Sequence, residues 1–216
     1  MEISSIAQFS GLIENHFRDR GDTTVVYRGH GAASFKLCPK VGRHVPPKLS
    51  GRTHVNEALM LELFRRQSPD RIGIATTDDW EFLSIAQHHG MATRLLDWTR
   101  NPLAALYFAV CKKDESWDAE GRPQHEDAEI IAWRRPKVDL TKPPKGSPLK
   151  IKQVIKYVPR ITTPRLRVQS GLFTVHPNPK EEFAPPGVLR IRIPYLQRKE
   201  LKDSLYRHGL NESVLF

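Results

Sequence analysis

The stretch QHHGMATRLLDWTRNPLAALYFA, residues 87–109, carries the clearest structural signals in the chain. The chain from about Asp79 to His89 has a helical pattern, which Gly90 ends because glycine tolerates the backbone conformation that follows a helix. Residues 95–98 then predict a short strand. Asn101-Pro102 predicts the start of a second helix, because an N-cap residue followed by proline is typical of helix starts. The stretch therefore predicts a helix, a strand and a helix, with polar side chains gathered between the two helices.

The rest of the chain predicts helices first and mostly strands later. We expect helices over residues 3–20, 54–67 and 195–208, and strands over residues 22–29, 128–133, 154–158, 171–176 and 188–193. We expect loops over residues 31–52, over the charged residues 112–127 and over the Pro- and Lys-rich residues 136–150. Helices followed by strands indicate an α+β fold rather than alternating βαβ units.

The composition indicates a globular protein with a basic surface. Of the 216 residues, 39% are hydrophobic and 27% are charged, and the formal net charge is +10. This charge favours a polyanionic partner, either nucleic acid or a phosphate-bearing ligand, although a basic surface can also serve solubility alone.

Several classes of protein are disfavoured by the same sequence. Cys38 and Cys111 lack the spacing of zinc ligands, so we expect no metal site and reduced thiols in a cytoplasmic protein. No run approaches the roughly 20 apolar residues of a membrane span. The first residues, Met1-Glu2-Ile3-Ser4, do not begin a signal peptide, and we expect no membrane partner.

Three segments carry the residue types of a ligand site. Arg28 ends a strand between Tyr27 and Gly29-His30, where its planar donor fork can bind a phosphate, although a surface arginine is the simpler reading. The second segment offers ligand-binding candidates between two helices: Gln87, His89, Thr93, Arg94, Trp98 and Thr99. In that segment Arg94 can instead pair with Asp97, and Trp98 can instead fill the core. The third segment, residues 165–174, places Gln169 ahead of a glycine that permits close backbone approach.

Together these segments resemble the FRG domain of bacteria and phages. Tyr27-Arg28-Gly29 is similar to the motif that names the family, and residues 87–109 and 165–174 are similar to its second and third motifs. The last motif matches Gly209-Leu210 and Leu215-Phe216, where the chain stops, and this leaves open whether the C-terminus is truncated. The resemblance implies an N-terminal helix over residues 1–20 and an FRG domain over residues 21–216, and it implies no established activity.

A weaker resemblance is to the ADP-ribosyltransferase fold, which implies N-terminal helices packed on a mostly antiparallel, split β-sheet. Those enzymes hold an NAD phosphate with an arginine that Arg28 matches, and residues 97–99 and 105–109 are similar to their next strand and helix. Gln169 stands where they carry a glutamate. Either Asp97 or Glu212 replaces that carboxylate, or the domain binds a nucleotide without transferring it. The resemblance thus implies NAD as the cofactor. It also implies Arg28, Asp97, Gln169 and Glu212 as catalytic residues, with Tyr27, Gly29 and His30 joining the ligand-binding set.

Two functions remain open from the sequence. The first is an NAD- or nucleotide-handling domain, an ADP-ribosyltransferase or NAD glycohydrolase serving as a toxin or defence effector, with protein or nucleic acid as acceptor. The alternative is a non-catalytic module that binds nucleic acid or another polyanion, with an affinity that falls steeply with salt. A metal-dependent nuclease is disfavoured, because adjacent histidines in a helix point about 100 degrees apart.

Overall fold

The computed structural model describes residues 1–18, 24–43, 56–67, 76–111, 125–135, 145–160 and 171–215. In these residues seven α-helices accompany one antiparallel sheet of six strands, which confirms the α+β prediction. The helices are α1 (Ile6–Phe17), α2 (Lys40–Arg43), α3 (Glu57–Gln67), α5 (Asp79–His88), α6 (Pro102–Cys111), α8 (Arg198–Arg207) and α9 (Glu212–Leu215). None of these helices is long and apolar enough to cross a membrane.

The strands are arranged in the order β4-β5-β2-β1-β3-β6. Their bounds are β1 (Thr24–His30), β2 (Leu95–Thr99), β3 (Ala128–Arg135), β4 (Ile155–Tyr157), β5 (Gly171–Val175) and β6 (Val188–Ile193). The predicted strands are thus confirmed within about two residues at each end, and β6 has the predicted bounds. Part of the loop expected over residues 31–52 is helical, because α2 forms a single helical turn within residues 31–43. Residues 44–52 lie outside the described residues.

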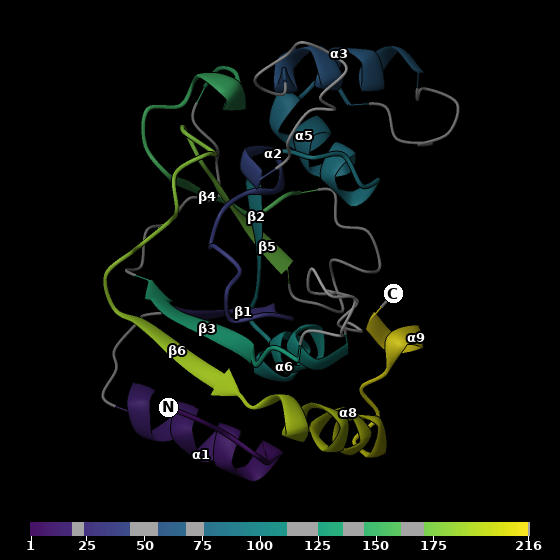
Figure 1. The fold of residues 1–216 in the computed structure, drawn as a ribbon. Helices are drawn as coiled ribbons and strands as arrows, with labels where there is room; N and C mark the ends of the chain where they lie inside the picture. The colour runs from purple at the N-terminus through teal and green to yellow at the C-terminus, as the bar shows by residue number, and fades with distance from the viewer. Residues whose placement is uncertain are drawn as a thin grey trace, which may run out of the picture.

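The sheet consists of two halves that meet at one residue pair. Strand β1 pairs with β3 along its whole length, but it pairs with β2 only where Tyr27 lies opposite Thr99. In Figure 1, β1, β3 and β6 run across the lower part of the molecule, whereas β2, β5 and β4 stand more upright above them. All six strands belong to one sheet, and β1 and β2 diverge beyond the Tyr27–Thr99 pair. The split sheet of the weaker resemblance stays a prediction.

Each half packs its own helices on one face. The lower half buries Tyr27, Ile130 and Ile191 against α1, α6 and α8. The upper half buries Leu95 and Phe173 against α5. In Figure 1, α1 and α8 accordingly lie at the bottom of the molecule, and α3 and α5 lie at the top.

The opposite face carries one cluster that both halves share. It contains Val26, Ile131 and Trp133 from the lower half, and Leu96, Trp98 and Leu172 from the upper half. Neighbouring residues of a strand point to opposite faces, so Val26 joins this cluster while Tyr27 joins the helix-covered core. We call this cluster the shared aromatic cluster, and it holds the two halves together beyond their single backbone pair.

Gly29 lets α6 approach β1 closely. A Cβ atom at Gly29 would overlap the carbonyl oxygen of Ala105 and lie 2.6 Å from the nitrogen of Ala109. The glycine of the Tyr27-Arg28-Gly29 motif is therefore explained by helix packing, with its backbone also lining the neighbouring pocket.

Candidate functional site

A pocket of about 510 Å³ opens where β1 and β2 diverge. Small-molecule sites commonly have volumes of about 300–1,000 Å³, so this pocket suits a small ligand. Its walls come from both strands, from the helix ends of α5 and α6, and from residues 31–43 that lead into and form α2. The lining residues are Tyr27, Arg28, Gly29, His30, Gly31, Phe35, Lys40, Arg43, Gln87, Met91, Leu95, Leu96, Asp97, Trp98, Thr99, Phe108 and Cys111.

Arg28 bridges the gap between the diverging strands. Its Nη1 donates to the main-chain carbonyl of Asp97 at 2.7 Å, and its Nε donates to Nε2 of His30 at 3.0 Å. The same Nη1 lies 3.6 Å from Oδ2 of Asp97, which makes a long ion pair. Among the described residues these contacts leave Nη2 of Arg28 without a hydrogen-bond partner, and only 16% of the side chain is exposed. Arg28 is thus held in a fixed orientation while one edge of its guanidinium stays available to a ligand.

His30 is a neutral, buried neighbour of Arg28. Its side chain is only 4% exposed, and its Nε2 accepts from Arg28, so the ring proton resides on Nδ1. Burial and the nearby charges of Arg28, Arg43 and Arg190 lower the pKa of His30 to about 3. The backbone of Phe35 acts in the opposite direction and raises this pKa, but it is the weakest of these causes. Nδ1 makes no hydrogen bond of good geometry within the described residues, which leaves a buried donor at the pocket wall.

A chain of hydrogen bonds positions Asp97. Nε2 of Gln87 donates to Oδ1 of Asp97 at 2.9 Å, and the hydroxyl of Thr93 donates to Oε1 of Gln87. Thr93 is fully buried and also accepts from the backbone nitrogen of Leu95 at 3.1 Å. Because its amide is fixed at both ends, Gln87 can present only its NH2 group to the carboxylate. The side chain of Asp97 is 59% exposed, so it faces the open side of the pocket.

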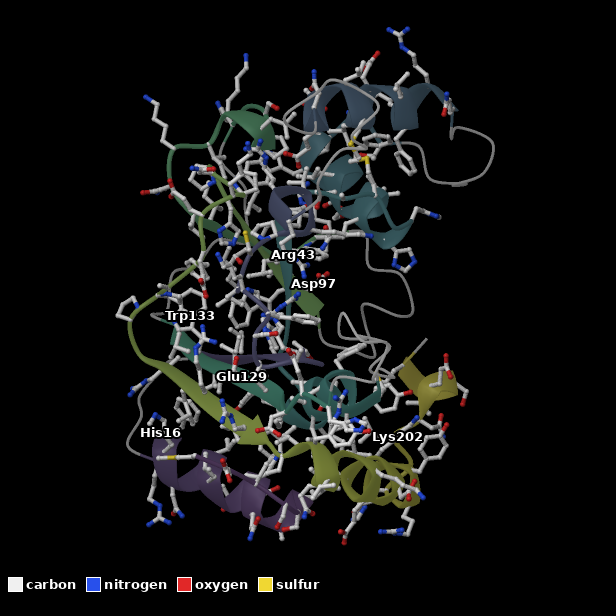
Figure 2. All side chains as sticks on the ribbon, in the orientation of Figure 1. His16, Arg43, Asp97, Glu129, Trp133 and Lys202 are labelled. Atoms are coloured by element: carbon white, nitrogen blue, oxygen red, sulfur yellow. The ribbon has the colours of Figure 1, made fainter. Side chains whose placement is uncertain are left out.

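Two further cations come from α2. Lys40 and Arg43 line the pocket together with Asp97, and Figure 2 labels Arg43 and Asp97 in the middle of the molecule. Nζ of Lys40 donates to the carbonyl of Gly90 at 3.0 Å, and the nitrogen of Val41 donates to the carbonyl of Thr93 at 3.2 Å. The side chain of Arg43 is exposed and makes no ion pair with the described residues. These contacts hold α2 against the segment that follows α5, so that its cations face the same opening as Arg28.

The sequence predicted part of this site. Of the predicted residues, Tyr27, Arg28, Gly29, His30, Gln87, Asp97, Trp98 and Thr99 line the pocket. Thr93 lies behind the wall, His89 is exposed outside it, and Glu212 on α9 is exposed and does not line it. Gln169 lies outside the described residues. The pocket is also lined by residues that were not predicted, among them Phe35, Lys40, Arg43, Met91 and Phe108. For the first three of these, the one available signal was the length of the loop expected over residues 31–52.

Arg94 has a structural contact instead of a place in the pocket. Its Nε donates to Oε2 of Glu57 at 2.8 Å, and its backbone nitrogen donates to Oε1 of the same residue at 2.7 Å. Both side chains are almost completely buried. The alternative pair of Arg94 with Asp97 is therefore wrong, and the pair with Glu57 fixes the start of α3 instead.

Trp98 contributes to the pocket wall, but its ring belongs to the core. Its Nε1 donates to the hydroxyl of Thr174 at 3.0 Å, and that hydroxyl also bonds Nε2 of His176 at 2.9 Å. The ring lies 5.6 Å from the ring of Trp133 and is 2% exposed. These contacts favour the core-filling alternative over stacking on a ligand.

The two thiols are free, as expected. Cys38 is buried and lies within hydrogen-bonding distance of the Pro179 carbonyl, 2.9 Å away. Cys111 is half-buried at the end of α6 and lines the pocket. Burial raises the pKa of both thiols, so neither is a ready nucleophile near neutral pH.

The chain carries an FRG domain, because the family model of the FRG domain matches residues 23–118. Each described residue that lines the pocket lies within this match. The domain's two most prominent motifs, around Arg28 and Asp97, therefore meet across one pocket. Searches of the curated proteins and of the solved structures found no match, so an ADP-ribosyltransferase-like fold stays a prediction.

Proposed function

We propose that this FRG domain binds a nucleotide through its diphosphate, in the pocket between β1 and β2, with NAD as the first candidate ligand. The observation that carries the proposal is the convergence of Arg28, Lys40 and Arg43 on one concave site that contains a pre-oriented guanidinium. Arginine suits phosphate because its planar donors match two phosphate oxygens at once. Lysine acts there as a point charge.

The walls of the pocket carry both charged and apolar groups. The cations and Asp97 supply the charges, and Phe35, Met91 and Phe108 contribute apolar surface. Such a combination suits a nucleotide, because its phosphates are charged and its base offers flat apolar faces. In this arrangement Asp97 and Thr99 accept hydrogen bonds from ribose hydroxyls.

We further propose that bound NAD is cleaved at the bond between nicotinamide and ribose. Cleavage breaks the carbon–nitrogen bond, nicotinamide leaves with the electron pair, and water or an acceptor adds to the ribose carbon with loss of a proton. The ribose carbon gains positive charge in this step, which a fixed carboxylate stabilises. Asp97 is the sole carboxylate among the described lining residues, so it takes that role in the proposal. A toxin or defence role would follow from such an activity.

The binding proposal is tested by the thermal stability of the protein with and without NAD. A ligand that binds only the folded state raises the melting temperature. The wild type should show a rise, Arg43→Ala should show a much smaller one, and Arg207→Ala should match the wild type. Arg207 is the matched control, because it is an exposed arginine at the end of α8, away from the pocket. No rise in the wild type would contradict the proposal.

The cleavage proposal needs its own measurement. Asp97→Asn keeps the shape of the side chain and an oxygen for Gln87, but it removes the negative charge. We expect this variant to retain the NAD-induced rise in melting temperature and to lose nicotinamide release. Equal release of nicotinamide by the variant and the wild type would show that Asp97 does not take part in the reaction.

The net charge of +10 supports one alternative, the binding of nucleic acid. Affinity for nucleic acid falls steeply with salt because counterions are released on binding. Nucleotide binding in a partly enclosed pocket is screened much less. A titration with single-stranded DNA at two salt concentrations, beside the same titration with NAD, therefore separates the two functions.

A further inference from the structure

We infer that the pocket takes its diphosphate as the free anion, without a divalent metal ion, and so selects diphosphate diesters of the dinucleotide type over magnesium-bound nucleoside triphosphates. The inference rests on the proposed nucleotide function, and it specifies the chemical form of the ligand. It is carried by the charges of the described lining residues and by the contacts that their polar atoms already make.

The described wall already supplies the positive charge that a metal ion would bring. Arg28, Lys40 and Arg43 oppose the single carboxylate of Asp97, and His30 is neutral because its Nε2 accepts from Arg28. Three cations and one carboxylate leave a net charge of +2 among these residues. A diphosphate diester carries one negative charge on each phosphate, and its total charge of about −2 balances the charge of these residues. A magnesium ion beside the two guanidiniums would be repelled by like charge at short range.

The wall also has little to offer a magnesium ion as ligands. Magnesium binds hard oxygen ligands, usually one or two carboxylates together with phosphate oxygens and water. Asp97 is the one carboxylate among the described lining residues. Its Oδ1 accepts from Gln87 at 2.9 Å, and its Oδ2 faces Nη1 of Arg28 at 3.6 Å. A metal ion at Oδ2 of Asp97 would therefore lie close to the guanidinium of Arg28 and would be repelled by its charge.

Donors for phosphate oxygens are present in the same wall. Nη2 of Arg28 has no hydrogen-bond partner within the described residues, and Nδ1 of His30 is a buried donor without a bond of good geometry. Both groups donate and neither accepts, so they suit bare phosphate oxygens rather than metal-bound water. The terminal phosphate of a nucleoside triphosphate helps to chelate magnesium, and the oxygens that bind the metal can then no longer accept hydrogen bonds from Arg28 and His30. A dinucleotide diphosphate lacks a terminal phosphate and keeps its oxygens free.

Isothermal titration calorimetry on the full chain tests this inference with two probes, NAD and ATP. Each probe is titrated once with EDTA and once with excess MgCl2, and NaCl keeps the ionic strength equal so that screening does not differ. We expect the Kd of NAD to be the same in both buffers. We expect the Kd of ATP to rise on the order of tenfold with magnesium, the effect of losing one charge-assisted hydrogen bond. Arg43→Ala should reduce this magnesium effect, and Arg207→Ala should leave it unchanged.

The outcomes separate this inference from the function on which it rests. Tighter binding of ATP with magnesium, or binding of NAD that requires magnesium, would overturn the inference and leave nucleotide binding in place. Equal binding of ATP in both buffers would overturn it as well. Absence of binding for both probes in both buffers would overturn the inference together with the proposed function.

Discussion

The guanidinium of Arg28 donates to the main-chain carbonyl of Asp97 at 2.7 Å, across the gap where β1 and β2 separate. This contact replaces a backbone hydrogen bond that the diverging strands do not make. It also brings the two leading motifs of the FRG domain together at the mouth of the pocket. Arg28 therefore has two separable tasks, one in the sheet and one in the proposed site.

Replacing Arg28 with lysine should reveal the task in the sheet. Lysine keeps the charge but lacks the planar fork that reaches His30 and the Asp97 carbonyl together. We expect the free energy of unfolding to fall by about 1–3 kcal/mol, because both hydrogen bonds of a largely buried guanidinium are lost. Arg43→Lys, at an exposed position, should change it by less than about 0.5 kcal/mol. Urea denaturation measures both values, and equal effects would show that the Arg28 contacts do not stabilise the sheet.

Replacing Gly29 with alanine should weaken the packing of α6 on β1. The added Cβ would overlap the Ala105 carbonyl oxygen, which belongs to helix backbone and cannot rotate away. We expect a loss of about 1–3 kcal/mol, the usual effect of overpacking. Gly11→Ala is the control, because nothing lies within 4 Å of its added Cβ in α1. That change should stabilise the protein by about 0.5–1 kcal/mol, and a stable Gly29→Ala variant would argue against close packing there.

Thr93 should influence ligand binding although it lies behind the pocket wall. Thr93→Val removes the hydroxyl that fixes the amide of Gln87, and with it the orientation of the group that donates to Asp97. For Thr93→Val we expect weaker NAD binding and a loss of stability of about 1–3 kcal/mol. Thr93→Ser keeps the hydroxyl, so it should keep the NAD affinity and the stability of the wild type. A merely structural threonine would lose stability without changing the affinity for NAD. Calorimetric Kd values beside urea denaturation separate these cases.

Two buried histidines should make the protein sensitive to acid. Burial, together with the charge of Arg28, lowers the pKa of His176 to about 4 and, with further cations, that of His30 to about 3. A histidine in the unfolded chain has a pKa of about 6.5, so the unfolded state binds these protons first. The stability due to the neutral rings is therefore present above about pH 6.5 and is lost as the pH falls toward 4, by up to about 1.4 kcal/mol per pH unit for each ring.

His176→Gln tests this expectation, because glutamine offers polar atoms near Thr174 but does not titrate. The free energy of unfolding is measured in urea across this pH range for the variant and the wild type. The variant should lose stability with a shallower slope as the pH falls. Parallel slopes would mean that His176 is not buried in its neutral form.

Local signals in the sequence predicted most of the elements, and long-range contacts account for what it missed. Asn101 and Pro102 predicted the start of α6, and the Asn101 side chain indeed accepts from the nitrogens of Leu103 and Ala104. The pair of Arg94 with Glu57 joins residues far apart in the sequence, so neighbouring residues offered no signal for it.

The cations of α2 escaped prediction for a similar reason. Their position depends on how residues 40–43 dock against the rest of the chain, and a Cβ at Gly42 would overlap the Pro179 carbonyl. Such a contact exists only in the folded chain. The motif residues Arg28 and Asp97 could be chosen from the sequence as site candidates, but their contact across the sheet could not, because it depends on strand order.

The meeting of the two sheet halves at Tyr27 and Thr99 has a consequence for how this pocket could diversify among related chains. The pocket walls belong to halves with separate helix-side cores, so the angle between the halves determines the width of the opening. That angle depends on the shared aromatic cluster, to which Trp133 and Leu172 contribute without lining the pocket. Changes of side-chain volume at these two positions would therefore change the size of the ligand that the pocket accepts, although every residue at the opening stays the same.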